Sequence, residues 1–377
     1  MIKSKLSRRT LLALAGLAAA GAAAEYKFGI FNSNNPKKGK YFFTFWSNVS
    51  GNYLMVVDFE KKSIQEFKMP QNAHFFEKFD VEKQIYLGTN RTGSYLTKLD
   101  LSKNSFEVFE PDTSYSLMGH VAYSKNKKYL CATARKEDKE AKVNSIVLLD
   151  QTTFKVIDAI ELPGGYPPHH DCKFLPNTEI LATTADQNIS FVDMNSKTVR
   201  VQKVPFENPL QNVRHFSLSD KGDLAIQSNV MFGTEPTSLA YSDGAIVVHE
   251  NSSNQTRVLN PVVNDMNIYN REMLDFEFSP NGDFFASLAR DYNYVTFWDF
   301  KTGQHFKSVP MKAPIRIIKS NDRSHFIVLT GYGLRFINTK TLEVDTTMNM
   351  FDQEITNSLV NRVLAGEYIV VAHRQLV

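Results

Sequence analysis

Two short patterns of apolar and polar residues alternate along the chain. The first is an apolar run, then a turn-forming or charged cluster, then a second apolar run, and its copies begin at Phe79, Tyr123, Phe174, Leu218, Phe278, Ile318 and Val363. The second is a β-rich run followed by a polar turn and another strand, and its runs end at Asp58, Asp100, Asp150, Asp193, His249, Asp299 and Asn338. No amphipathic helical pattern of useful length interrupts them, so the chain is predicted to be all-β.

The spacing of the second pattern predicts the architecture. Its end residues are 42, 50, 43, 56, 50 and 39 residues apart, and internal repeats of this period are typical of propeller blades. The chain opens with the second pattern and closes with the first, so we expect C-terminal strands to join the first blade, begun by residues 40–70, and close the ring. The prediction is a single seven-bladed β-propeller, WD40- or YVTN-like, over residues 40–377.

The first 24 residues follow a different pattern. Four basic residues precede an unbroken apolar and small-residue run, and Ala22-Ala23-Ala24 forms a small-residue cleavage site. Residues 1–24 are therefore predicted to be a signal peptide cleaved near Ala24, and residues 25–39 a linker to the propeller. The Arg8-Arg9 pair is typical of the twin-arginine export signal, although an ordinary secretory signal with two arginines remains open. We expect a periplasmic monomer without a stable membrane anchor.

Charge and cysteine content narrow the possible functions. The chain has 377 residues, with 43 Lys and Arg against 40 Asp and Glu, and the predicted signal peptide holds four of the basic residues and no acidic one. The remainder has a formal net charge of −1, and no concentrated basic face indicates nucleic-acid binding. Cys131 and Cys172 are the only cysteines. We expect both to be buried free thiols, although the predicted compartment permits a disulfide.

Several polar residues recur at one level of successive blades, about ten residues before the second apolar run of the first pattern. They are His74, His120, His170, His215, Asp275 and Arg316, with Asn361 or Ser358 in the closing blade. Imidazole is the commonest ligand for zinc, copper and non-haem iron. The metal-ligand candidates are therefore His74, His120, His170 and His215, supported by Asp171 and Asp275, with His169, Arg214 and Arg316 at the channel mouth.

A structural explanation for these histidines remains open. WD-type propellers carry a Gly-His signature of their own, which Gly119-His120 matches. The chain has no Gly-rich phosphate loop, no H-E-x-x-H, no nucleophile elbow and no C-x-x-C. The sequence therefore identifies no catalytic residue, and the expected cofactor is an iron, copper or zinc ion.

The order of these motifs resembles an uncharacterised family of secreted bacterial propellers. The matching stretches, between about residues 70 and 340, are Gly119-His120, Pro168-His169-His170-Asp171 and Arg214-His215. The family tends to have a Glu-Asn pair after the Gly-His blade, where this chain has Arg135-Lys136, and an Arg-Arg-Pro-Gly-like turn where Trp46 to Gly51 stands. Its members are often encoded beside imelysin-type iron-uptake proteins and dihaem oxidoreductase-like proteins, so the resemblance implies iron-handling partners.

Together these observations predict a non-catalytic periplasmic binding or scaffold propeller. It is expected to bind a metal ion through a His-lined channel mouth and to act with iron-uptake partners. The alternative is an enzyme, either a metal-dependent oxidoreductase or a lactone hydrolase, because propellers carry many functions.

Overall fold

The computed structural model describes most of the predicted propeller. The described residues are 40–47, 51–70, 73–90, 93–137, 142–164, 168–232, 240–259, 262–263, 266–267, 275–289, 292–355 and 369–376. The predicted signal peptide and linker, Asn361, Ser358 and the side chain of His74 lie outside the described residues. Among the described residues, no helix is both long and apolar enough to cross a bilayer.

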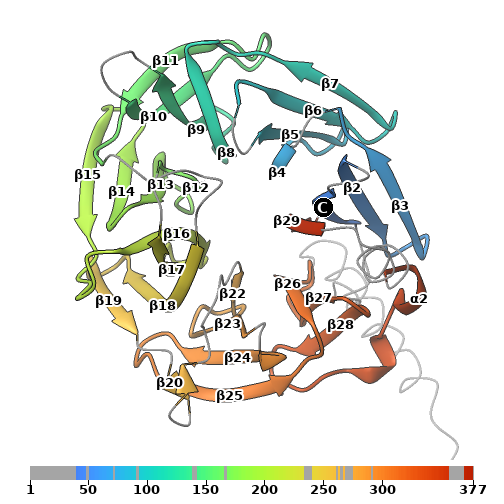
Figure 1. Cartoon of the computed structure of the whole chain (residues 1–377). Helices are drawn as coiled ribbons and strands as arrows, with labels where there is room; N and C mark the ends of the chain where they lie inside the picture. Colours follow the sequence, from blue (N-terminus) through green and yellow to red (C-terminus); the bar gives the residue numbers. More distant parts are fainter. Residues whose placement is uncertain are drawn as a thin grey trace, which may run out of the picture.

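Seven antiparallel sheets surround a central axis, and together they form the predicted seven-bladed β-propeller (Figure 1). From the innermost strand outward, the first three sheets are β29 (Ile369–Leu376), β1 (Lys40–Ser47), β2 (Gly51–Asp58) and β3 (Ser63–Lys68); β4 (Ala73–Asp80), β5 (Ile85–Asn90), β6 (Leu96–Asp100) and β7 (Ser105–Phe109); and β8 (Tyr115–Tyr123), β9 (Leu130–Glu137), β10 (Lys142–Leu149) and β11 (Val156–Glu161).

The other four sheets follow in chain order. They are β12 (Cys172–Phe174), β13 (Ile180–Ala185), β14 (Asn188–Asp193) and β15 (Thr198–Lys203); β16 (Gln211–Leu218), β17 (Leu224–Phe232), β18 (Ala240–Glu250) and β19 (Gln255–Leu259); β22 (Phe276–Phe278), β23 (Phe284–Ala289), β24 (Tyr294–Asp299) and β25 (His305–Pro310); and β26 (Pro314–Lys319), β27 (His325–Thr330) and β28 (Gly333–Asn338). A separate hairpin, β20 (Val262–Val263) and β21 (Met266–Asn267), lies between the fifth and sixth blades.

The ring closes as the order of the two patterns predicts. The C-terminal strand β29 pairs antiparallel with β1, so it supplies the innermost strand of the first blade. Among the described residues the seventh blade has three strands, and the chain after β28 covers its outer edge through bridges from Leu334 to Met350 and from Ile337 to Val344. This covering segment contains the short helices η2 (Thr346–Met348) and α2 (Asp352–Ile355).

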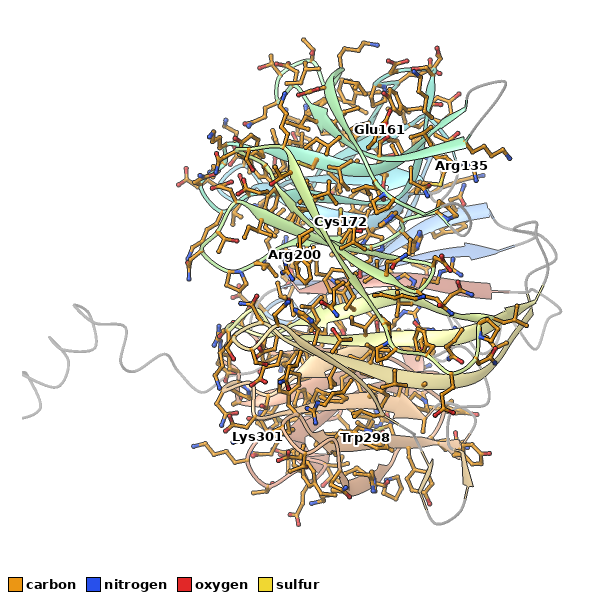
Figure 2. The ribbon with its side chains drawn as sticks, turned by 90° about the vertical axis from the view of Figure 1, so that its left-hand side faces the viewer. Arg135, Glu161, Cys172, Arg200, Trp298 and Lys301 are labelled. Atoms are coloured by element: carbon orange, nitrogen blue, oxygen red, sulfur yellow. The ribbon has the colours of Figure 1, made fainter. Side chains whose placement is uncertain are left out.

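The hydrophobic core is divided among the interfaces between blades. Within the part of the chain that the structure describes, seven clusters of buried apolar side chains occur, and each joins two neighbouring blades, including one between the seventh blade and the first. Cys131 and Cys172 belong to the cluster between the third and fourth blades, and both are buried free thiols, as predicted. The side view places Cys172 within the body of the ring, with Arg135 and Lys301 on opposite faces (Figure 2). Packing between blades therefore accounts for most of the apolar runs.

Candidate metal centre

Irregularities interrupt the pairing of several innermost strands at the candidate polar residues. A β-bulge inserts extra residues into one strand and re-aims the local side chains. In β8, the three residues from Met118 to His120 stand opposite Thr133 alone. In β16, Arg214 and His215 stand opposite a single residue. Similar shifts occur in β4 at His74 and in β26 at Ile315.

The bulges change the register that counting along the sequence predicts. Gly88, Ala132 and Thr183 stand at one level of their blades, because each pairs with the residue three places before the turn aspartate, Asp100, Asp150 or Asp193. The residues directly before their partners on the innermost strands are Phe75 (before Phe76↔Gly88), His120 (before Val121↔Ala132) and Asp171 (before Cys172↔Thr183). Phe75 and Asp171 thus occupy the level at which the sequence pattern placed His74 and His170. His170 comes one residue earlier, from the loop that enters β12.

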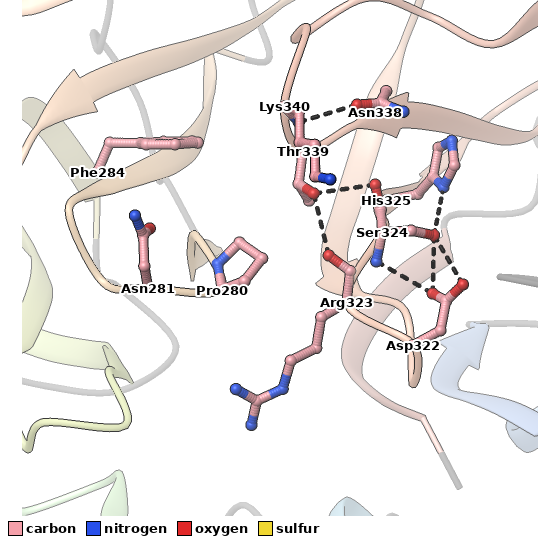
Figure 3. A pocket seen from close by; sticks show the side chains of 10 residues that line it. All are labelled: Pro280, Asn281, Phe284, Asp322, Arg323, Ser324, His325, Asn338, Thr339 and Lys340. Atoms are coloured by element: carbon pink, nitrogen blue, oxygen red, sulfur yellow. Dashed lines mark hydrogen bonds between the residues drawn. The ribbon is translucent and has the colours of Figure 1, made fainter. Parts of the chain in front are cut away.

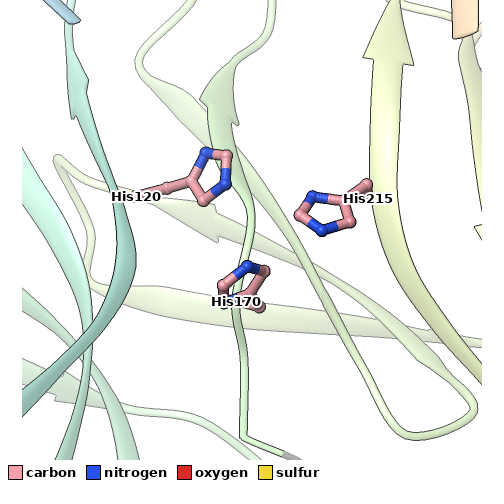
Figure 4. A group of neighbouring side chains, drawn as sticks. All are labelled: His120, His170 and His215. Carbon is pink, nitrogen blue, oxygen red and sulfur yellow. The ribbon is translucent and has the colours of Figure 1, made fainter. Parts of the chain in front are cut away.

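Three of the four candidate histidines nevertheless meet. His120, His170 and His215 come from three successive blades, and the possible ligand atoms of their rings all lie within 4.8 Å of one another (Figure 4). All three side chains are buried, and their ring centroids are 4.8 to 5.7 Å apart. An ion bound at about 2.0–2.1 Å from each nitrogen needs only a modest inward movement of these rings, on the order of 1 Å. The group can therefore hold one metal ion.

Neighbouring oxygens favour one tautomer in two of these rings. His170 Nδ1 hydrogen-bonds to the carbonyl oxygen of Met118, which can only accept, so its proton is assigned to Nδ1 and its lone pair to Nε2. His120 Nδ1 lies 3.0 Å from Asp171 Oδ1, and the nearby carboxylate favours the same tautomer. His215 Nδ1 lies 4.0 Å from Asp171 Oδ2, on the same side of the cluster. Neutral imidazoles with an available Nε2 are the form that ligates metals.

Asp171 is the charged residue at the centre of this arrangement. Burial raises the pKa of its carboxyl, but His120 and Lys173 lower it by more, so the net pKa is well below its ordinary value and the group is ionised. Lys173 Nζ lies 2.8 Å from Asp171 Oδ2 and donates to the carbonyl oxygen of Phe216. Glu77 interacts electrostatically with Asp171 and Lys173. Burial raises the pKa of Glu77 to about 7, although Lys78 and Lys173 oppose this rise.

His169 lies beside the cluster but has a different role. Its Nδ1 lies 3.2 Å from Thr183 Oγ1 and its Nε2 lies 3.1 Å from the carbonyl oxygen of Pro163, so both ring nitrogens have protein partners. Burial lowers its pKa to about 4, although the contact with Pro163 opposes this. These contacts are those of a neutral structural histidine. Arg214, also expected at the channel mouth, is half-buried on β16, and its carbonyl accepts a hydrogen bond from Thr184.

Asp275 and Arg316 form a separate pair on the other side of the ring. Asp275 Oδ2 accepts from the backbone N–H of Ile317 at 3.0 Å, as Asp171 Oδ2 accepts from Phe216 at 3.2 Å. Arg316 Nε lies 3.9 Å from the same carboxylate oxygen, and its side chain is fully buried. The same carboxylate-to-backbone bond thus joins the fourth blade to the fifth and the sixth blade to the seventh. The residue directly before the N–H donor is His215 in the fifth blade and Arg316 in the seventh. Asp275 and Arg316 do not join the histidine cluster.

A cavity of about 730 Å³ lies beside the turns that follow β22 and β26, between the sixth and seventh blades (Figure 3). Asp322, Ser324 and His325 line it and hydrogen-bond to one another along one wall. Phe284 and Asn281 lie on the facing wall. None of the three histidines lines this cavity: His120 and His215 lie within β8 and β16, and His170 lies just before β12.

Comparison with known proteins supports the propeller fold, and it does not bear on the chemistry of the histidine cluster. No protein-family model and no curated protein sequence matches the chain. Hydrazine synthase from Kuenenia stuttgartiensis has a similar structure, with a TM-score of 0.56 and 15% identity over 80% of this chain and 91% of that chain. A protein from Lactobacillus plantarum gives a TM-score of 0.57 and 10% identity over 84% of this chain and 96% of its own. Dihydro-heme d1 dehydrogenase NirN, in complex with DHE, gives 0.54 and 13%, over 82% of this chain and 63% of its own. At these identities the likeness establishes the propeller fold alone.

Proposed function

We propose that this propeller is a non-catalytic metal-binding protein, in which His120, His170 and His215 ligate one transition-metal ion. The convergence of three buried imidazoles from successive blades, with ligand atoms within 4.8 Å, is the observation that carries the proposal. Three imidazole ligands suit zinc, copper and iron, and affinity for divalent ions of this series is highest for copper. The ionised Asp171 beside two of the rings makes them stronger ligands.

Thermal unfolding with added metal tests this proposal. Because an ion bound only by the folded state stabilises it, zinc, copper or iron at 100 times its dissociation constant should add about 2.7 kcal/mol. The melting temperature of metal-free protein should then rise by roughly 5 °C at pH 7.5. At pH 5.5 the rise should shrink, because protonated imidazole, with an ordinary pKa of about 6.5, cannot ligate.

Two variants separate a ligand from a structural histidine. His170→Ala should remove the metal-dependent rise while the metal-free protein stays folded. His249 is also buried, but its Nδ1 lies 2.9 Å from Thr256 Oγ1 in the fifth blade, outside the cluster. His249→Gln should therefore lower the melting temperature without metal and keep the rise. The metal site is rejected if iron, copper, zinc, manganese and nickel all leave the melting temperature of the unaltered protein unchanged.

We also propose that the protein works in the periplasm, beside partners of iron uptake. The basic and apolar pattern of residues 1–24 and the family resemblance support this placement. Replacing Arg8 and Arg9 together with Lys should leave the precursor in the cytoplasm, as fractionation and immunoblotting would show. Undisturbed export in a strain that lacks the twin-arginine machinery would contradict this route.

A further inference from the structure

The His120 ring is held by two side chains that are not themselves candidate ligands. The Phe75 ring stacks on its face, with the ring centroids 4.8 Å apart and the planes inclined by 18°. Asp171 Oδ1 lies at its edge, 3.0 Å from Nδ1. The stacking contact opposes tilting of the imidazole, and the carboxylate opposes its rotation by half a turn. Together they determine where Nε2 points.

Phe75 reaches this position because of two features of the second blade. The β4 bulge at His74 shifts the strand, so that Phe75 occupies the level of His120 and Asp171 in the next two blades. On the neighbouring strand β5, a Cβ at Gly88 would lie 2.8 Å from the Phe75 carbonyl oxygen and 3.0 Å from the Phe76 ring. The missing side chain thus permits the close approach of the two strands that brings Phe75 against the third blade.

Asp171 is itself held from two directions. Its Oδ2 accepts from the backbone N–H of Phe216 at 3.2 Å and from Lys173 Nζ at 2.8 Å. Its side chain is 2% exposed, so water does not compete for these contacts. With Oδ2 engaged by the fifth blade and by Lys173, Oδ1 is directed to His120. The carboxylate is therefore held in one orientation, with Oδ2 toward the fifth blade and Oδ1 toward His120 of the third blade.

We propose that Phe75 and Asp171 are positioning residues that hold His120 ready to ligate the ion before the ion arrives, although neither contacts it. This inference rests on the proposed metal site. A ligand whose tautomer and orientation are already set loses less freedom on binding, and residues that orient a ligating histidine typically change metal affinity by about 10–100-fold. The affinity of the cluster should accordingly depend on both residues.

Zinc titration of full-length variants measures this dependence. Asp171→Asn keeps the size of the side chain but removes the charge and allows an N–H to face the ring, so we expect affinity to fall about 10–100-fold. Phe75→Leu should lower the zinc affinity by roughly tenfold, within the same range. Phe75→Tyr keeps an aromatic ring at this position and should retain most of the affinity of the unaltered protein. Phe79→Leu is the matched control, because Phe79 lies on the same strand and packs against Tyr123 and Phe154. It should lower stability without changing affinity.

A measurement without metal separates this inference from the metal site itself. Nitrogen-15 NMR of the imidazoles should show the Nδ1-protonated tautomer of His120 in the unaltered protein and a mixture in Asp171→Asn. If the unaltered protein binds none of zinc, copper, iron, manganese and nickel, the metal site is rejected, whereas the tautomer of His120 still tests whether Asp171 orients this ring. If His120→Ala abolishes zinc binding but Asp171→Asn and Phe75→Leu bind as tightly as the unaltered protein, the positioning role is wrong.

Discussion

A chain shortened by residues 357–377 is expected to be insoluble or readily digested by protease. This deletion removes β29, which pairs with β1 at seven positions and contacts the innermost strands β4 and β26 on either side. At about 1 kcal/mol for each lost backbone pair, the loss would be about 7 kcal/mol. That is comparable to the whole stability of a typical domain, about 5–15 kcal/mol. The deletion also leaves β1 as an exposed sheet edge, which favours aggregation.

The antiparallel pairing provides a control for this deletion. Because Leu376 pairs with Tyr41, the end of β29 lies close to the start of β1. Moving residues 357–377 to a position just before Lys40 should therefore restore the closed ring through a short hairpin, and with it solubility and protease resistance. A soluble truncated chain with the melting temperature of the full chain would show that β29 is not needed to close the ring.

The fold follows from the sequence because the blades repeat. Each blade must bury its apolar face against a neighbour, so the same apolar runs recur seven times, and the order of the patterns at the two ends predicts the closing strand. The buried thiols follow as well, since Cys131 and Cys172 lie within these apolar strands. The number of blades, the closing strand and the buried thiols all depend on the repeating pattern of apolar and polar runs. One extra residue in a strand does not change that pattern.

The site depends on those extra residues, and this is why it is only partly predictable. Counting residues placed His170 level with His120 and His215, whereas the ladders place Asp171 there and bring His170 in from the preceding loop. The same counting did not single out Phe75, the residue that stacks on His120, and the side chain of its neighbour His74 lies outside the described residues. Asp275 was grouped with the histidines, yet it pairs with Arg316. The one available signal was the Gly119-His120 dipeptide, because a glycine beside a candidate ligand suggests an unusual backbone.

Replacing that glycine, in Gly119→Ala, should both destabilise the protein and abolish metal binding. Gly119 lies in the β8 bulge with a φ of +123°, a conformation that residues with a side chain rarely adopt. An alanine there should cost about 1–3 kcal/mol if the backbone is kept. If the bulge collapses instead, it moves two parts of the site, because the bulge holds both the Met118 carbonyl that orients His170 and the His120 ring itself.

Loss of metal binding should therefore accompany a modest loss of stability in Gly119→Ala, and the control separates the two effects. Gly51 also has a positive φ, +86°, and no atom lies within 4 Å of its added Cβ. It begins β2 in the first blade, away from the histidines. Gly51→Ala should thus lower the melting temperature of the metal-free protein but keep the rise on adding zinc, whereas Gly119→Ala should lose that rise. Zinc binding by Gly119→Ala at the affinity of the unaltered protein would mean that the bulge does not position the ligands.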